Sequence, residues 1–251
     1  MFERVGAHVA VITLNRPRVH NAIDVAMAEA IERHVAEVEA DDDIRVGIVA
    51  ANGQSFCAGA DLREVAAGRG AALSRPETGF AGFVYAHRRK PWIAAVQGAA
   101  LGGGTEIALA CDMVVAGEAA SFGLPEVRRG LIAGAAGAYR IARAVPRALA
   151  LEIAVTGQPI DAWRAHAAGL VNRVVDPGRV LDEALALAAL ITANSPLAVR
   201  ETLRITRSSI DLDEERLRAV QDQAIATVLA GPDITEGATA FVEKRAPVWR
   251  T

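Results

Sequence analysis

The chain has 251 residues, a hydrophobic fraction of 52% and a formal net charge of −3. This composition excludes a disordered chain, and the charge provides no electrostatic footprint for nucleic acid. Two cysteines without a CxxC spacing exclude a disulfide framework and a cysteine-based zinc site. We therefore predict an α/β protein with reduced thiols that carries no metal, binds no nucleic acid and resides in the cytoplasm.

The sequence also lacks the marks of secretion and of membrane insertion. We expect no signal peptide, because no basic segment followed by an apolar run opens the chain. The most apolar long window, residues 92–110, contains Gln97, Glu106 and four glycines, and is therefore a poor membrane span. We predict no contact with membranes.

The first third of the chain follows the order strand, helix, strand. Apolar, β-branched runs over residues 9–14 and 44–50 predict strands. Residues 23–40 place apolar side chains on one helical face, with Asp24 as the N-cap. This order favours a parallel crossover with helices packed on a sheet. Residues 66–80 are rich in Ala, Gly, Arg, Ser and Pro, so we expect a mobile loop there.

The remaining elements divide the chain near residue 190. We expect further strands over residues 91–96 and 113–116, and helices that end at residue 110 and cover residues 138–155 and 180–191. After that point the pattern is helical and rich in charge, with no strand signal. We therefore predict a core domain over residues 1–190 and a helical C-terminal region over residues 191–251.

The segment most suggestive of chemistry is residues 98–111, GAALGGGTEIALAC. Three consecutive glycines would each cost a helix interior roughly 1 kcal/mol relative to alanine. They allow a ligand to approach the backbone closely, and a helix N-terminus there would direct N–H groups at negative charge. Glu106 lies in apolar surroundings that would raise its pKa and suit it to proton transfer. A solvated glutamate on the first helical turn is an equal alternative at this stage.

Two further segments carry weaker signals. Residues 55–62, SFCAGADL, are read most simply as a packed turn with Asp61 capping a helix, and alternatively as the source of a second oxyanion donor, the Ala60 N–H. Glu126 follows a proline, and taken alone an ion pair with Arg128 or Arg129 is the simpler interpretation. Two glutamates with raised pKa values in one pocket could instead hold a water molecule and share acid and base roles.

Six segments together resemble the signature segments of the enoyl-CoA hydratase/isomerase (crotonase) superfamily, in the same order and spacing over nearly the whole chain. They read NRPRVHNAI, FCAGADLRE, ALGGGTEIALACD, FGLPEVRRGLIAG, GLVNRVV and FVEKRAPVW. The resemblance implies a crotonase-like spiral of ββα units with a helical C-terminal trimerisation region. It also implies an acyl-CoA substrate, no separate cofactor, and a homo-oligomer that is a trimer or a dimer of trimers.

The resemblance also implies roles for individual residues. The N–H groups of Ala60 and Gly103 would form the oxyanion hole, and Glu106 and Glu126 would be the catalytic acid/base pair. Surface or interface packing is nearly as good an interpretation for the basic members of the remaining set. The residues expected to contact the CoA thioester are Arg18, Ala58, Ala60, Asp61, Leu62, Arg63, Gly103, Phe241 and Lys244.

The sequence departs from the family pattern at a few positions. Ala133 replaces a common proline and Ala136 a common glycine in the turn after Glu126. Trp163 and His166 are unusual before GLVNRVV, and His166 is interpreted as a packed or surface histidine rather than a catalyst. These departures put the shape of the acyl site in question more than the reaction class.

The preferred hypothesis is a hydratase that adds water to a 2-enoyl-CoA and yields a 3-hydroxyacyl-CoA. An enoyl-CoA isomerase, or another acyl-CoA lyase of the superfamily, is the nearest alternative because one glutamate can suffice to move a proton. A dinucleotide-binding oxidoreductase is disfavoured, since Gly130, Gly134 and Gly137 lack the G-x-G-x-x-G spacing. An RNA-binding member of the superfamily is disfavoured by the net charge.

Overall fold

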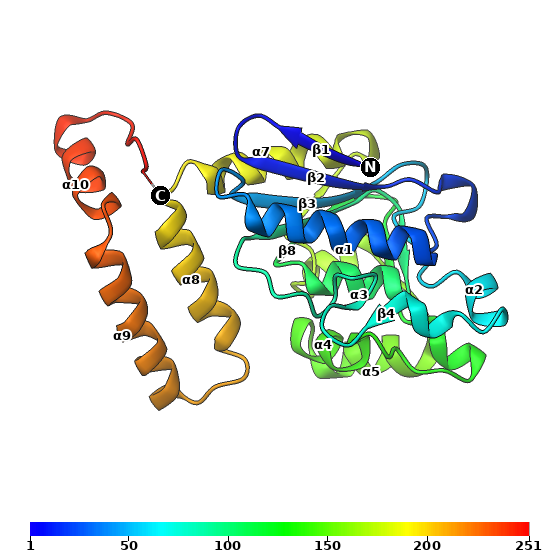
Figure 1. The fold of residues 1–251 in the computed structure, drawn as a ribbon. Coiled ribbons are helices and arrows are strands. Elements are labelled where there is room, and N and C mark those ends of the chain that lie inside the picture. Colours follow the sequence, from blue (N-terminus) through cyan, green and yellow to red (C-terminus); the bar gives the residue numbers. More distant parts are fainter. Residues whose placement is uncertain (251) are drawn as a thin grey trace.

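The computed structural model describes residues 1–250, and its core is a six-stranded sheet (Figure 1). The strands lie in the order β1-β2-β3-β6-β8-β11, with β1 antiparallel to β2 and every other neighbouring pair parallel. The strand predictions for the first half of the chain are confirmed to within two residues. The bounds are β1 (Phe2–Val5), β2 (Val9–Leu14), β3 (Val46–Ala51), β6 (Trp92–Val96), β8 (Met113–Gly117) and β11 (Arg173–Val175).

Ten α-helices lie within the described residues, and the first seven pack around the sheets. Asp24 begins the first of them by accepting a hydrogen bond from the Met27 N–H at 2.8 Å, as predicted. The helices are α1 (Val25–Ala40), α2 (Leu62–Ala66), α3 (Gly103–Ala110), α4 (Gly137–Ala144), α5 (Arg147–Thr156), α6 (Ala162–Ala167), α7 (Val180–Thr192), α8 (Pro196–Ser208), α9 (Glu214–Ala230) and α10 (Asp233–Glu243).

Both faces of the large sheet are buried, because successive side chains of a strand point to opposite sides. Val9 and Val11 of β2 pack on the face that α7 covers. Ile12 and Leu14 of the same strand belong to the main core, together with the apolar side of α1. The near-continuous apolar run of β2 follows from this double burial.

A second, smaller sheet lies over the main core and positions the site. Its strands run in the order β10-β9-β7, and two isolated parallel bridges, Cys57 with Ala100 and Ile23 with Ala60, lie beside it. Two successive stretches of chain each give one strand to the large sheet, the next to the small sheet, and then a helix. This repeated ββα order winds the chain into a spiral. The small strands are β7 (Ala99–Leu101), β9 (Ser121–Gly123) and β10 (Ile160–Asp161).

The C-terminal helices α8, α9 and α10 extend away from the sheet as an arm (Figure 1). The chain bends by 107° between α7 and α8. Arg207 of α8 holds the arm by donating to both carboxylate oxygens of Asp112 at 2.7 Å. Arg143 of α4 pairs with Asp211, which follows α8, at 2.9 Å. The domain boundary at residue 190 stays a prediction.

Two predictions of local structure were wrong. Residues 66–80, for which a mobile loop is predicted, contain regular structure: a 3-10 turn, Gly70–Leu73, and a hairpin of β4 (Ser74–Arg75) and β5 (Gly79–Phe80). The hairpin forms because Leu73 and Phe80 are buried in the main core. The single helix expected over residues 138–155 is two helices, since Pro146 forces the preceding residue out of the helical region.

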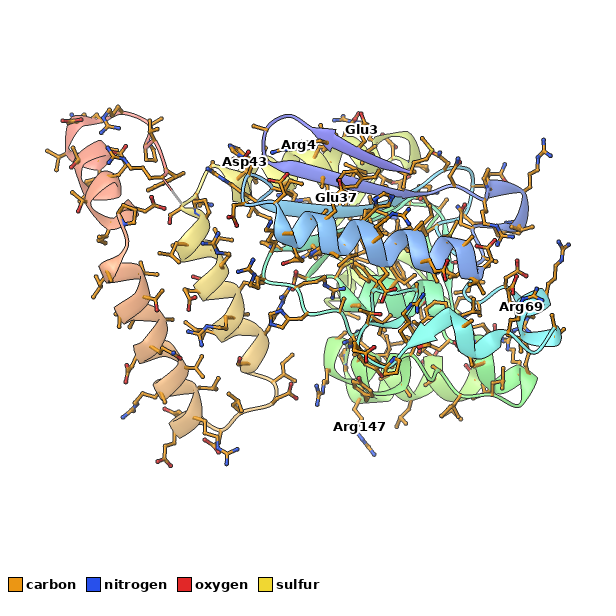
Figure 2. The ribbon with its side chains drawn as sticks, in the orientation of Figure 1. Glu3, Arg4, Glu37, Asp43, Arg69 and Arg147 are labelled. Carbon is orange, nitrogen blue, oxygen red and sulfur yellow. The ribbon has the colours of Figure 1, made fainter. Side chains whose placement is uncertain are left out.

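Charged side chains, among them those of Arg4, Asp43, Arg69 and Arg147, project from the outer surface (Figure 2). At the edge of the large sheet Arg4 lies 3.5 Å from Asp43. At the start of α5 the exposed Arg147 projects away from the core (Figure 2). Arg147 therefore offers a site where a guanidinium can be removed with little effect on the interior.

Within residues 1–250, no single helix combines the length and apolar character needed to cross a membrane. Residues 177–208 meet those criteria only as two helices joined by the sharp bend.

Candidate active site

The N-terminus of α3 is held in place by the small sheet. Thr105 is fully buried, and its hydroxyl contacts the Ala100 carbonyl at 2.6 Å and the Gly123 carbonyl at 2.9 Å. The same hydroxyl oxygen accepts a hydrogen bond from the Gly123 N–H at 3.0 Å. Gly102, the N-cap, has φ 55° and ψ −124°, a backbone conformation suited to glycine. The glycine-rich turn is thus fixed on both sides before the helix begins.

The predicted oxyanion donors, Ala60 and Gly103, come from two segments in direct contact. A Cβ on Gly59 would lie 2.9 Å from the Gly103 nitrogen, so only glycine allows this approach. The Ala60 N–H points away from Ile23, because the bridge between them uses the Gly59 carbonyl and the Asp61 N–H. The Gly103 N–H is the first of its helix. Neither N–H donates a hydrogen bond within the described residues, so both are available to one ligand oxygen.

Glu106 lies on the first turn of α3 and is 3% exposed. Its Oε1 accepts a hydrogen bond from the Gly137 N–H at 2.9 Å. Burial raises the pKa of Glu106 to about 7, the Gly137 hydrogen bond opposes this, and the charge of Glu126 adds to it. The alternative of a solvated glutamate is therefore wrong. A carboxyl that titrates near neutrality is suited to proton transfer.

Glu126 lies in the 3-10 helix Pro125–Arg129 and is not part of a surface ion pair. Its Oε2 is buried and has no hydrogen-bond partner within the described residues. Its Oε1 lies 3.0 Å from the position that a Cβ on Gly102 would occupy. Burial raises the pKa of Glu126. The carboxyl is therefore directed at the glycine turn, with one oxygen unpaired beside it.

The structure thus brings all four predicted catalytic groups to the beginning of α3. Two free N–H groups and two carboxyls with raised pKa values lie around the glycine turn, residues 102–104, where the backbone carries no side chains of its own. Such an arrangement can stabilise a developing oxyanion and move protons beside it. It contains no ligand set for a metal, since the described residues include no group of three His, Cys, Asp or Glu side chains close enough to hold one.

The predicted CoA residues Ala58, Leu62 and Arg63 are exposed around the beginning of α2, next to Ala60. Arg18 is exposed on the 3-10 helix Pro17–Val19. Asp61 has a structural role: its carboxylate accepts from the Arg63 N–H at 3.0 Å and pairs with Arg16 at 3.0 Å. These contacts, with the Arg63 N–H first among the causes, lower the pKa of Asp61.

Phe241 and Lys244 lie at the end of α10, on the arm, and the chain does not bring them to its own α3 (Figure 1). Phe241 is 85% exposed. Their expected role requires a neighbouring subunit, so it stays a prediction.

Several side chains near the site were not identified from the sequence. Phe80 packs where a side chain on Gly103 would lie, since a Cβ there would be 2.4 Å from its ring. The charge of Arg140 acts to lower the pKa of Glu106. The charge of Glu106 in turn acts to raise the pKa of Tyr85. The composition of residues 66–80 predicts a mobile loop, so no sequence pattern places Phe80 beside Gly103. Arg140, however, follows the segment of Glu126 by a few residues.

His166 is an exposed surface residue, which is one of the two interpretations drawn from the sequence. Its Nδ1 lies 2.8 Å from the Val171 carbonyl oxygen, and its ring contacts Trp163 edge-on. Ala136 adopts φ 76°, in the left-handed region that favours glycine over residues with a Cβ. The departure at this position is thus accommodated with backbone strain at the turn that carries the Gly137 N–H.

Comparison with known proteins agrees with this geometry. The enoyl-CoA hydratase/isomerase family matches residues 4–251. The chain is 41% identical to a mevalonyl-coenzyme A hydratase of Aspergillus fumigatus over 97% of this chain and 92% of that one. It is 38% identical to a 2,3-dehydroadipyl-CoA hydratase of Escherichia coli over 95% and 94%. An enoyl-CoA hydratase structure from Mycobacterium tuberculosis shares 42% identity and superposes with a TM-score of 0.95 over 100% and 98%.

The chain therefore belongs to the enoyl-CoA hydratase/isomerase family and has the crotonase fold. Membership of this family of acyl-CoA enzymes confirms the resemblance drawn from the six sequence segments. The dinucleotide-binding alternative finds no support, because Gly137 begins α4 and donates its N–H to Glu106.

Proposed function

We propose that the protein is an enoyl-CoA hydratase that converts a 2-enoyl-CoA and water into a 3-hydroxyacyl-CoA. The observation that carries this proposal is the unpaired, buried Oε2 of Glu126, in a carboxyl that acts electrostatically on Glu106 and lies at the glycine turn before the free Gly103 N–H. A water molecule between the two carboxyls would satisfy that oxygen. The names of the hydratases to which the chain is similar support the same reaction.

The thioester carbonyl oxygen would accept hydrogen bonds from the Ala60 and Gly103 N–H groups. Both donors are fixed by the Gly59 contact before substrate arrives, so little reorganisation is needed when charge develops. The N-terminal end of α3 adds a favourable dipole. Electron density withdrawn toward this oxygen makes C3 of the enoyl group electrophilic.

The glutamates would supply the proton transfers. One carboxylate removes a proton from water while the water oxygen bonds to C3. The π electrons of the double bond move toward the thioester and form an enolate. C2 of the enolate then takes a proton from the other carboxyl, which completes the 3-hydroxyacyl product. Raised pKa values suit both groups to this exchange near neutral pH.

We further propose that the CoA is bound as part of the substrate, without a separate cofactor, and that the enzyme works in the cytoplasm as a trimer or a dimer of trimers. The arm supports the oligomer: Leu229 of α9 and Phe241 and Val242 of α10 are 61–85% exposed. Apolar side chains on one arm commonly mark a protein interface. Phe241 and Lys244 would then lie near the CoA of a neighbouring subunit.

The proposal is tested by steady-state hydration of 2-enoyl-CoA esters with wild type, Glu106→Gln and Glu126→Gln. Each variant removes an acid/base group, so we expect kcat to fall about 100-fold or more. Glu118→Gln, at an exposed position, is the matched control and should keep wild-type activity. Full hydration by the Glu106 variant would overturn the proposal. If wild type does not hydrate 2-enoyl-CoA esters but shifts the double bond of a 3-enoyl-CoA, the isomerase alternative is favoured.

A further inference from the structure

Three polar side chains form a group beside Glu106 that the proposed reaction does not use: Tyr85, Tyr139 and Arg140. Arg140 lies three residues after Gly137 on α4, so both occupy the same helical face. Gly137 on this face donates to Glu106. Arg140 is therefore one turn further along the face of α4 that meets the catalytic carboxyl.

Tyr85 is placed beside Arg140 by the chain after the hairpin. Its N–H donates to the Thr78 carbonyl at 2.9 Å, and its ring lies over Gly79, where a Cβ would be 2.5 Å away. Its ring centroid is 5.6 Å from the Arg140 guanidinium carbon. The Tyr139 phenol interacts with that of Tyr85 and, with burial, raises the Tyr85 pKa. The Tyr85 phenol thus stays a neutral hydrogen-bond donor at physiological pH.

Arg140 is a cation without a full set of acceptors. Its Nη1 is buried, and no acceptor lies within hydrogen-bond distance among the described residues. The next charged residue of α4, Arg143, is also a cation; it lies over the Tyr139 ring and pairs with Asp211, so it offers Arg140 no acceptor. A buried guanidinium nitrogen without an acceptor is costly, and a carboxylate, which can accept two parallel hydrogen bonds, would satisfy it best.

We propose that Arg140, with Tyr85 and Tyr139, binds a carboxylate at the far end of the acyl chain, so the substrate is a 2-enoyl-CoA with a terminal carboxylate. This inference rests on the proposed hydratase reaction. With the thioester oxygen at Ala60 and Gly103 and C3 between the glutamates, the acyl chain beyond C3 passes Glu106. The next turn of α4, about 4.5 Å further for three residues, presents Arg140 to it.

The test compares kcat/KM for three six-carbon 2-enoyl-CoA esters that end in a methyl group, a hydroxyl or a carboxylate. We expect wild type to favour the carboxylate ester over both others at least tenfold, mainly through KM. Arg140→Leu should abolish this preference, and Tyr85→Phe and Tyr139→Phe should each reduce it severalfold. Arg147→Leu, which removes an exposed guanidinium, should leave the ratio unchanged.

The outcomes separate this inference from the proposed function. If no ester is hydrated, the proposed function fails. If the three esters are hydrated equally well, if the hydroxyl ester matches the carboxylate ester, or if the preference persists without the Arg140 guanidinium, only the carboxylate site is overturned. Should Arg140→Leu fail to fold, the two Tyr→Phe variants decide the matter, because each removes one oxygen and preserves the ring.

Discussion

At the scale of single residues, Glu106 combines function with a cost to stability. Its carboxyl is buried, and its pKa lies at about 7 instead of 4.5. A carboxyl whose pKa is raised in the folded state stabilises the fold below its unfolded pKa, and this contribution is lost as pH rises through the folded pKa. The protein should therefore lose stability between about pH 4.5 and pH 7 on account of this residue.

Replacing the carboxyl by an amide in Glu106→Gln should remove this dependence of stability on pH. The amide keeps an acceptor for the Gly137 N–H and carries no charge, so the variant should be more stable than wild type at pH 8, by up to about 3 kcal/mol at roughly 1.4 kcal/mol per pKa unit. The difference should shrink as pH falls toward 4.5. Urea unfolding of both proteins at one fixed concentration measures it. A variant that is less stable than wild type at pH 8 contradicts this account of the carboxyl.

At the scale of elements, the position of the N-terminus of α3 depends on the hydrogen bonds of the Thr105 hydroxyl. The hydroxyl connects α3 to both β7 and β9, and the side chain is fully buried. Thr105→Val keeps the shape but leaves the Gly123 N–H and two carbonyls without this partner. We expect a loss of about 1–3 kcal/mol in the free energy of unfolding.

The matched control is Thr227→Val, which removes an exposed hydroxyl bonded within α9. That change should alter stability by less than about 0.5 kcal/mol. Denaturant titration compares the two variants. Equal effects would mean that the small sheet does not depend on Thr105.

Sequence patterns predicted the long elements and missed the short ones, for identifiable reasons. α1 and β2 carry a periodicity over enough residues to be read. β7 and β9 have three residues each, too few for any period. The break before α5 has a local signal in Pro146, which disfavours the helical conformation at Val145.

Some residues of the site lie in local sequence motifs, and others come together only through the tertiary fold. Ala60, Gly103 and Glu106 lie in short segments that resemble the family's signatures, although each segment taken alone leaves a structural alternative open. The approach of Glu126 to Gly102 joins segments more than twenty residues apart and is fixed by the pairing of β7 with β9. Tyr85 and Arg140 meet only through packing of the hairpin segment near α4. No local pattern encodes that contact.

At the scale of the whole molecule, the arm is the element on which the proposed oligomer depends. α9 and α10 expose Leu229 and Phe241, and the end of α8 contacts the core through the Arg207–Asp112 and Arg143–Asp211 ion pairs. We therefore expect Leu229→Glu to lower the mass measured by sedimentation at a fixed concentration, since it places a charge in an apolar interface. An unchanged mass would show that α9 lies outside the interface.

In the proposed reaction, the two glutamates add water to the double bond of an enoyl-CoA whose thioester oxygen is bound by the Ala60 and Gly103 N–H groups. The most direct measurement is mass spectrometry of the product formed from a 2-enoyl-CoA in water enriched with oxygen-18 and, separately, in heavy water. The account predicts one oxygen-18 at C3 in the first solvent and a deuteron at C2 in the second, with both lost in Glu106→Gln and Glu126→Gln. Exchange of hydrogen without any oxygen-18 at C3 would contradict it.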